Sequence, residues 1–139
     1  MKRIFIIAMI LSVSTLGFAG YESDLVERMK IVETETQEII DSGINMMAAT
    51  MDLEETWSSE YEKIKKIIIS ELSPKEKSKF IDEEKKWAVQ MEKSAKKEAD
   101  ESEADGGQIY SLIYSARKTE LLKERAIELA KKYDSITNN

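Results

Sequence analysis

The side chains of this 139-residue chain that could carry chemistry are mostly carboxylates, and they are densest in one short stretch. Five of the eight residues from Glu98 to Asp105 are acidic, and two glycines follow them. An EF-hand calcium loop with Gly106 at its sixth position needs a glutamate at its twelfth, where Leu112 stands. Two interpretations are favoured over calcium: a solvated helix end, or a surface that contacts a cationic protein. The contact residues in the second interpretation are Glu101, Glu103, Asp105, Gly106 and Gly107.

Composition excludes most other catalytic machinery. The chain has no histidine and no cysteine, which excludes imidazole or thiolate metal sites, cysteine nucleophiles and Ser-His-Asp triads. Carboxylate pairs that could act on glycosides, such as Glu83/Glu84 and Glu54/Glu55, are adjacent on expected helices and therefore point to different faces. Lysine-rich stretches alternate with glutamates, which favours helical ion pairs over a nucleic-acid surface. The sequence predicts a protein that is not an enzyme and needs no cofactor or metal.

The N-terminal residues are typical of a secretory signal peptide, predicted at residues 1–19. Two basic residues precede an apolar run over residues 4–16, and small residues at 17 and 19 precede a cleavage point after Ala19. The apolar run is shorter than the ~20 residues of a membrane-spanning helix, although an uncleaved anchor is the alternative. We expect residues 20–139 to form a single helical domain that is secreted or periplasmic and has no stable membrane insertion.

The charge of the predicted mature chain indicates its class of partner. Without residues 1–19 the chain has 19 basic and 27 acidic residues, a net charge of −8. Such a protein is repelled by nucleic acid and by anionic lipid. It is attracted to cationic proteins over a Debye length of about 8–10 Å.

Helix-breaking residues divide the mature chain into four segments with helical periodicity. The breaks are Ser42-Gly43, Ser73-Pro74 and Asp105 to Gly107, and the segments cover about 23–42, 45–72, 74–104 and 108–133. Ser73, Pro74 and Glu76 form a capping-box pattern at the start of the third segment. Its apolar stripe contains one charged residue and reads Phe80, Glu84, Trp87 and Met91.

One apolar stripe on each segment predicts a shared core. We expect an all-α fold, an elongated antiparallel bundle of three to four helices. The second and third segments should form the main hairpin, with the fourth packed back on them. The predicted core residues are Trp57, Tyr61, Ile64, Ile68, Phe80, Trp87, Met91, Leu112, Leu122 and Leu129.

Several groups of residues follow one another in a familiar order. They are Thr36-Gln37, Glu54 with Trp57-Ser58 and Tyr61, Trp87 with Glu92, Gly106-Gly107, and Arg125 with Glu128-Leu129. The order resembles the lysozyme inhibitor LprI-like N-terminal domain family of exported bacterial proteins over residues 36–129. Cysteines of that family are replaced by Gly43, Ala95 and Arg117, and its arginine and threonine by Met91 and Leu122. The chain therefore resembles a cysteine-free variant, which forgoes about 2–4 kcal/mol for each disulfide.

The resemblance implies a helical domain that inhibits lysozyme. Our first hypothesis is a non-enzymatic binding protein for lysozyme-type cell-wall hydrolases, because many lysozymes are basic and opposite charge speeds encounter. The alternative is an envelope structural or chaperone-like protein that holds partner helices. Apolar residues outside the main stripes motivate that alternative, namely Met47, Met51, Ile67 and Ile69.

Overall fold

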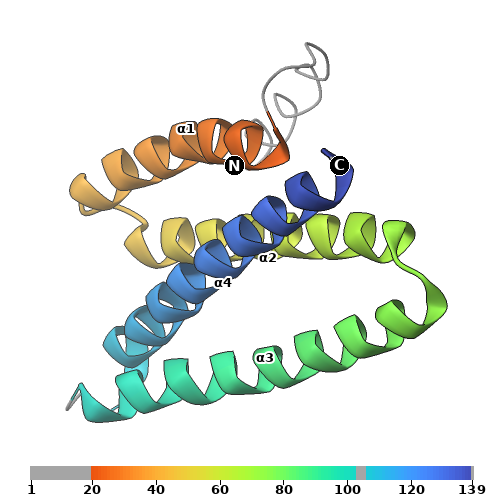
Figure 1. Cartoon of the computed structure of the whole chain (residues 1–139). Coiled ribbons are helices and arrows are strands. Elements are labelled where there is room, and N and C mark those ends of the chain that lie inside the picture. Colours follow the sequence, from red (N-terminus) through yellow and green to blue (C-terminus); the bar gives the residue numbers. More distant parts are fainter. Residues whose placement is uncertain (1–19, 103–105, 139) are drawn as a thin grey trace.

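A computed structural model describes residues 20–102 and 106–138, and this part of the chain is helical without any strand (Figure 1). The four helices are α1 (Tyr21–Asp41), α2 (Met46–Glu71), α3 (Pro74–Glu101) and α4 (Gly107–Thr137). The all-α prediction is confirmed. The predicted signal peptide lies outside the described residues. No helix in the described ranges is both long and apolar enough to span a membrane.

The starts and ends of the helices follow from local residues. At the start of α3, the Glu76 backbone N–H donates to Ser73 Oγ over 3.4 Å, and the Ser73 N–H donates to Glu76 Oε2 over 3.0 Å. This is the predicted capping box, with Pro74 in the first turn. Between α1 and α2, Gly43 (φ 72°) and Asn45 (φ 59°) adopt left-handed backbone conformations, so α1 ends there and the chain reverses.

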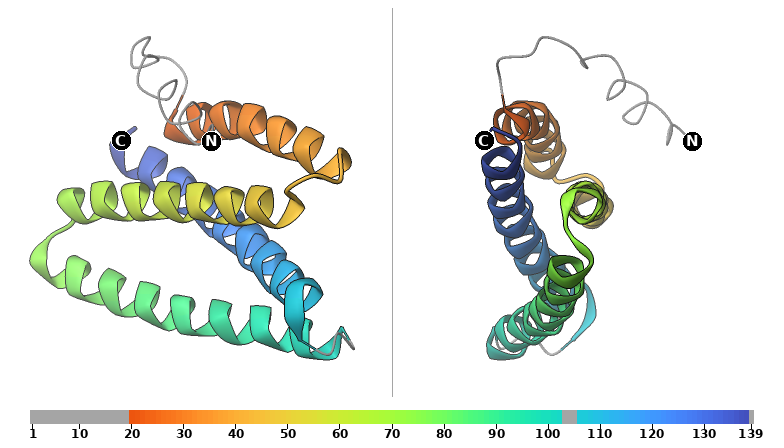
Figure 2. Two further views of the ribbon diagram at one scale, coloured as in Figure 1. Left: turned by 180° about the vertical axis from the view of Figure 1, so that it is seen from behind. Right: turned by 45° about the vertical axis from the view of Figure 1, so that its right-hand side comes forward.

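The central element is α4, which packs against each of the other three helices. Its most extensive contact is with α2, whereas α2 and α3 diverge from their connecting turn (Figures 1 and 2). The prediction that α2 and α3 form the main hairpin is therefore wrong. An apolar stripe shows that a face is buried, but not which helix covers it. Ala126 and Ala130 of α4 are fully buried in the core that α2 and α4 share, while α3 offers few large apolar side chains.

The buried core lies mainly between α2 and the C-terminal half of α4, with contributions from α1 and α3. It consists of Leu25, Met29, Trp57, Tyr61, Ile64, Ile68, Phe80, Leu122, Ala126, Leu129 and Ala130. Of the remaining residues expected in the core, Trp87 and Met91 are partly buried and pack against it. Leu112 is half-buried and lies outside this cluster, because the part of α4 in the core begins only at Leu122.

The start of α1 is held by the end of α4 (Figure 1). The Tyr21 N–H donates to Asp134 Oδ1 over 2.7 Å, and the Glu22 N–H donates to Asp134 Oδ2 over 3.0 Å. The rings of Tyr21 and Tyr133 meet edge to face, with centroids 5.6 Å apart. Asp134 therefore supplies the N-terminal cap that α1 lacks in its own sequence, where Gly20 stands.

Candidate functional site

Residues from three helices meet in what we call the Arg125 cluster: Tyr61 of α2, Glu84 and Trp87 of α3, and Arg125 of α4. The Tyr61 hydroxyl donates to Glu84 Oε2 over 2.9 Å, and Arg125 Nε donates to the same oxygen over 3.3 Å. A second guanidinium nitrogen of Arg125, Nη2, donates to Glu84 Oε1. The Glu84 side chain is 2% exposed and that of Arg125 is 23% exposed. The forked contact thus fixes the carboxylate against α4.

Aromatic packing completes the cluster. The Tyr61 and Trp87 rings have centroids 5.0 Å apart, and the Arg125 guanidinium carbon lies 5.9 Å from the centre of the Trp87 ring. An arginine over an indole face gains cation–π attraction. Three residues of the family resemblance, Tyr61, Trp87 and Arg125, thereby contact one another or share Glu84 as a partner.

The titration behaviour of the Arg125 cluster favours a structural role over acid–base chemistry. Burial, followed by hydrogen bonding to Glu84, raises the pKa of the Tyr61 hydroxyl. Burial alone would lower the pKa of Arg125, but its hydrogen bonds to Glu84 and Glu128 raise it overall. Neither group gives up a proton near neutral pH. The arrangement joins α2, α3 and α4.

A second buried carboxylate, which sequence reasoning missed, joins α1 to α2. Glu60 is 1% exposed. Arg28 Nη1 donates to Glu60 Oε1 over 2.9 Å, and Arg28 Nη2 donates to Oε2 over 3.3 Å. The sequence signal was weak, because Glu60 lies beside the apolar stripe of α2 and not within it.

Carboxylates considered for glycoside chemistry do not form a pair that opens into a cleft. In each adjacent pair, one residue packs inward and the other faces solvent. Glu84 is buried while Glu83 is exposed. Glu54 accepts from the Ser115 hydroxyl over 2.6 Å and pairs with Lys118 over 3.0 Å, whereas Glu55 is exposed. Within the described ranges, no three acidic residues lie close enough together to hold a metal ion.

The predicted contact loop is only partly within the described residues, and its contact role stays a prediction. Glu103 and Asp105 lie outside them. Glu101 is exposed at the end of α3, where its carboxylate is 3.7 Å from Lys97 Nζ. Gly106 and Gly107 are exposed and both have φ of 75°, a conformation that favours glycine.

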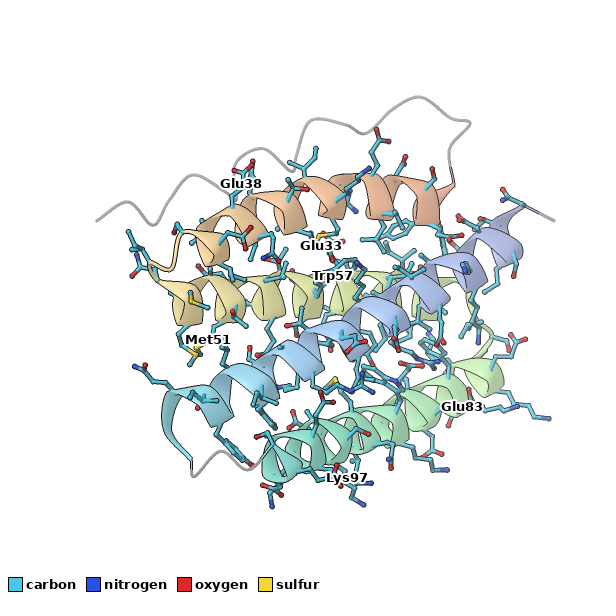
Figure 3. All side chains as sticks on the ribbon, turned by 90° about the vertical axis from the view of Figure 1, so that its left-hand side faces the viewer. Glu33, Glu38, Met51, Trp57, Glu83 and Lys97 are labelled. Atoms are coloured by element: carbon cyan, nitrogen blue, oxygen red, sulfur yellow. The ribbon has the colours of Figure 1, made fainter. Side chains whose placement is uncertain are left out.

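The strongest charge imbalance lies on α1, a feature that the sequence analysis did not single out. Seven residues of α1 are acidic and two are basic, a net charge of −5. Some of these acids serve the fold: Glu33 accepts from Trp57 Nε1 over 3.2 Å and from Lys123 Nζ over 2.8 Å. Others, such as Glu38, point away from the bundle (Figure 3). A count of charges per predicted helix could have found this surface.

Comparison with known proteins identifies one matching family. The family described as lysozyme inhibitor LprI has a model that matches residues 34–129. No curated protein and no solved structure matches the chain. The matched range covers well over half of the chain and includes every residue of the Arg125 cluster.

Proposed function

The chain belongs to the lysozyme inhibitor LprI family, and from this premise we propose that it is an exported binding protein that inhibits lysozyme-type cell-wall hydrolases. The observation that carries the proposal is the family match over residues 34–129, which reaches into all four helices. We place the protein outside the cytoplasm, as the predicted signal peptide requires.

Inhibition of this kind needs a surface and no reaction centre. The Arg125 cluster is largely buried and joins α2, α3 and α4. The predicted mature charge of −8 suits a basic hydrolase, because opposite charges speed encounter and fix orientation. We therefore propose that inhibition results from covering the hydrolase surface. The sequence-based prediction puts the contact at Glu101, Glu103, Asp105, Gly106 and Gly107.

A cell-wall lysis assay tests this function. Chain 20–139 is added to a basic animal lysozyme acting on a cell-wall suspension, at low and at physiological salt. We expect saturable inhibition at micromolar protein that weakens as salt rises, because salt screens exposed charges. An unrelated acidic helical protein of equal net charge is the control. Unchanged lysis at low salt would remove the proposal.

The alternative role, a chaperone-like envelope protein, gains little from the four residues that motivated it. Met51 is exposed, but Met47 and Ile67 are half-buried and Ile69 packs against the core. Light scattering after size-exclusion chromatography, together with a client-aggregation assay, distinguishes this role from inhibition. A monomer that leaves client aggregation unchanged would exclude it.

A further inference from the structure

Three isoleucines are exposed along α1 and in the turn that follows it. Ile31 is 61% exposed and Ile39 is 39% exposed, and Ile44 in the following turn is 67% exposed. Ile31, Glu35 and Ile39 are spaced by four residues and therefore form one row along the helix. Covering side chains of this size with the apolar surface of a partner removes them from water and favours association.

Unpaired carboxylates flank these isoleucines. Glu27 and Glu35 lie one helical turn before and after Ile31, and Glu38 lies two turns after it. All three are exposed, and none forms an ion pair with any described residue. Arg28 of α1 is committed to the buried Glu60. We call Glu27, Ile31, Glu35, Glu38, Ile39 and Ile44 the α1 outer surface.

We propose that the α1 outer surface, rather than the acidic loop predicted from sequence, is where a basic lysozyme-type hydrolase docks. This inference rests on the proposed function and names its contact surface. Apolar side chains ringed by uncompensated negative charge match an apolar spot ringed by lysine and arginine on a partner. A second copy of this chain would place two helices of net charge −5 against each other, and an anionic lipid surface would be repelled in the same way.

Two triple variants and one matched control test the surface. The apolar variant is Ile31→Gln, Ile39→Gln and Ile44→Gln, and the charge variant is Glu27→Gln, Glu35→Gln and Glu38→Gln. The control removes the same number of charges elsewhere, with Asp82→Asn, Glu83→Gln and Glu124→Gln. Circular dichroism and thermal unfolding verify that each variant is folded before lysozyme inhibition is measured.

We expect the apolar variant to weaken inhibition about tenfold or more at every salt concentration. The charge variant should weaken it about tenfold at low salt and less at high salt. The control should change it less than about threefold. If both α1 variants inhibit as well as the wild type, the surface assignment is wrong while the function stands. If the wild type itself does not inhibit, the function fails and the assignment fails with it. Self-association that the apolar variant abolishes would assign the surface to a second copy instead.

Gly20 directly precedes α1 and lies beside Asp134. Its φ is −67°, so its backbone conformation does not require glycine. A Cβ atom at this position would lie 2.6 Å from Asp134 Oδ2, so a larger residue would displace this carboxylate. Asp134 already accepts from the N–H groups of Tyr21 and Glu22. A carboxylate in this place also complements the positive end of the α1 dipole.

We infer that the α-ammonium group created by cleavage after Ala19 pairs with Asp134, so that processing stabilises the attachment of α1 to α4. The inference rests on the predicted cleavage point and on the position of Gly20 beside Asp134, independently of any hydrolase. The new charge would appear one residue before two N–H groups that Asp134 already binds. Opposite charges at that range favour each other most where the carboxylate is partly shielded from water.

Selective acetylation of the α-amine tests this pairing. Chain 20–139 is compared with the same chain acetylated at Gly20, each with and without Asp134→Asn. We expect acetylation to lower the Tm by about 2–4 °C with Asp134 present, and to have little effect in the Asp134→Asn variant, which lacks the carboxylate charge. Titration by NMR should place the pKa of the Gly20 amine above the usual value of about 7.7–8.0. Equal Tm shifts in both backgrounds, or an amine pKa in the usual range, would overturn the pairing.

Discussion

Helices α1 and α3 are both long, highly charged and in contact with α4, yet they use charge in opposite ways. Helix α3 has eight acidic and eight basic residues, and several pair along its exposed side, such as Lys86 with Asp82 at 2.8 Å. Helix α1 has seven acids and two bases, and its outward acids lack ion-pair partners within the described residues. A helix whose charges pair with one another has little net attraction for a charged partner. A helix with unpaired negative charges attracts a cationic partner.

The same two helices also differ in how they begin. Helix α3 has its own capping box at Ser73, built from residues three positions apart. The cap of α1 is Asp134, more than a hundred residues away in the sequence. The start of α3 is therefore stabilised by neighbouring residues in the sequence, whereas the start of α1 is stabilised by a residue of α4. These differences in charge and in capping predict how substitutions in α1 and α3 change stability.

The largest effect is expected where α3 is attached through a buried charge. Arg125→Met leaves the Glu84 carboxylate buried without its main partner, and we expect the free energy of unfolding to fall by about 3 kcal/mol. Urea unfolding measures this change. The control Arg117→Met removes a contact with the exposed side chains of Glu98 and Glu120 and should lower stability by about 0.5 kcal/mol. Equal losses in the two variants would show that the Arg125 cluster does not anchor α3.

A somewhat smaller effect, with a pH dependence, is expected at Tyr61. Tyr61→Phe removes a hydrogen bond to a carboxylate and should lower the free energy of unfolding by about 2 kcal/mol at pH 7. Because the folded state raises the Tyr61 pKa above the ordinary value of about 10, its contribution is present below pH ~10 and is lost as pH rises further. The variant should therefore lose less stability than the wild type between about pH 10 and 12. Parallel stability curves above pH ~10 would contradict this assignment.

Ser73→Ala removes the N-cap side chain of α3 and should lower the free energy of unfolding by about 1 kcal/mol. In a peptide of residues 72–101, the same substitution should lower helicity measured by circular dichroism. A peptide of residues 20–41 should be less helical than the α3 peptide, since it lacks Asp134. An α1 peptide as helical as the α3 peptide would show that α1 does not depend on its cap from α4.

These results also separate what the sequence can predict from what it cannot. Four helices and the Ser73 cap follow from spacings of three and four residues, which are local. Glu84 in the apolar stripe of α3 was a usable signal, because a charge at a stripe position must find a buried partner. The preference of α4 for α2 and the Asp134 cap depend on contacts between distant residues, which periodicity does not encode.

For the candidate site, the predicted contact loop depended on local acidic density, and the α1 outer surface depends on what remains unpaired after folding. Glu33 follows Leu25 and Met29 at a spacing of four residues and so lies toward the buried side of α1, whereas Glu38 lies on the opposite side. In the folded chain, Glu33 binds Trp57 and Lys123, while Glu38 faces solvent (Figure 3). The tertiary structure adds which residues the inward acids bind and which acids stay without an ion pair to any described residue.

The smallest expected change in stability is at Glu38, and its direction distinguishes α1 from α3. Glu38 lies in the last turn of α1, where no basic residue offsets the negative end of the helix dipole. It also lies three residues from Glu35 and Asp41, and like charges at that spacing repel. Glu38→Gln should therefore raise the free energy of unfolding by about 0.3–0.5 kcal/mol. Glu83→Gln on α3 removes a pair with Lys79 and should lower it by about 0.2 kcal/mol or leave it unchanged.

Thermal unfolding at low salt shows whether Glu38→Gln stabilises the chain and whether Glu83→Gln destabilises it. Raising the salt to about 1 M should reduce both changes in stability. A stabilising Glu38→Gln variant that inhibits lysozyme less well would mean that α1 keeps an acid that is unfavourable for folding because a partner needs it. If Glu38→Gln destabilises the chain as Glu83→Gln does, the charge of α1 is as well compensated as that of α3. The contrast between the two helices would then rest on their caps alone.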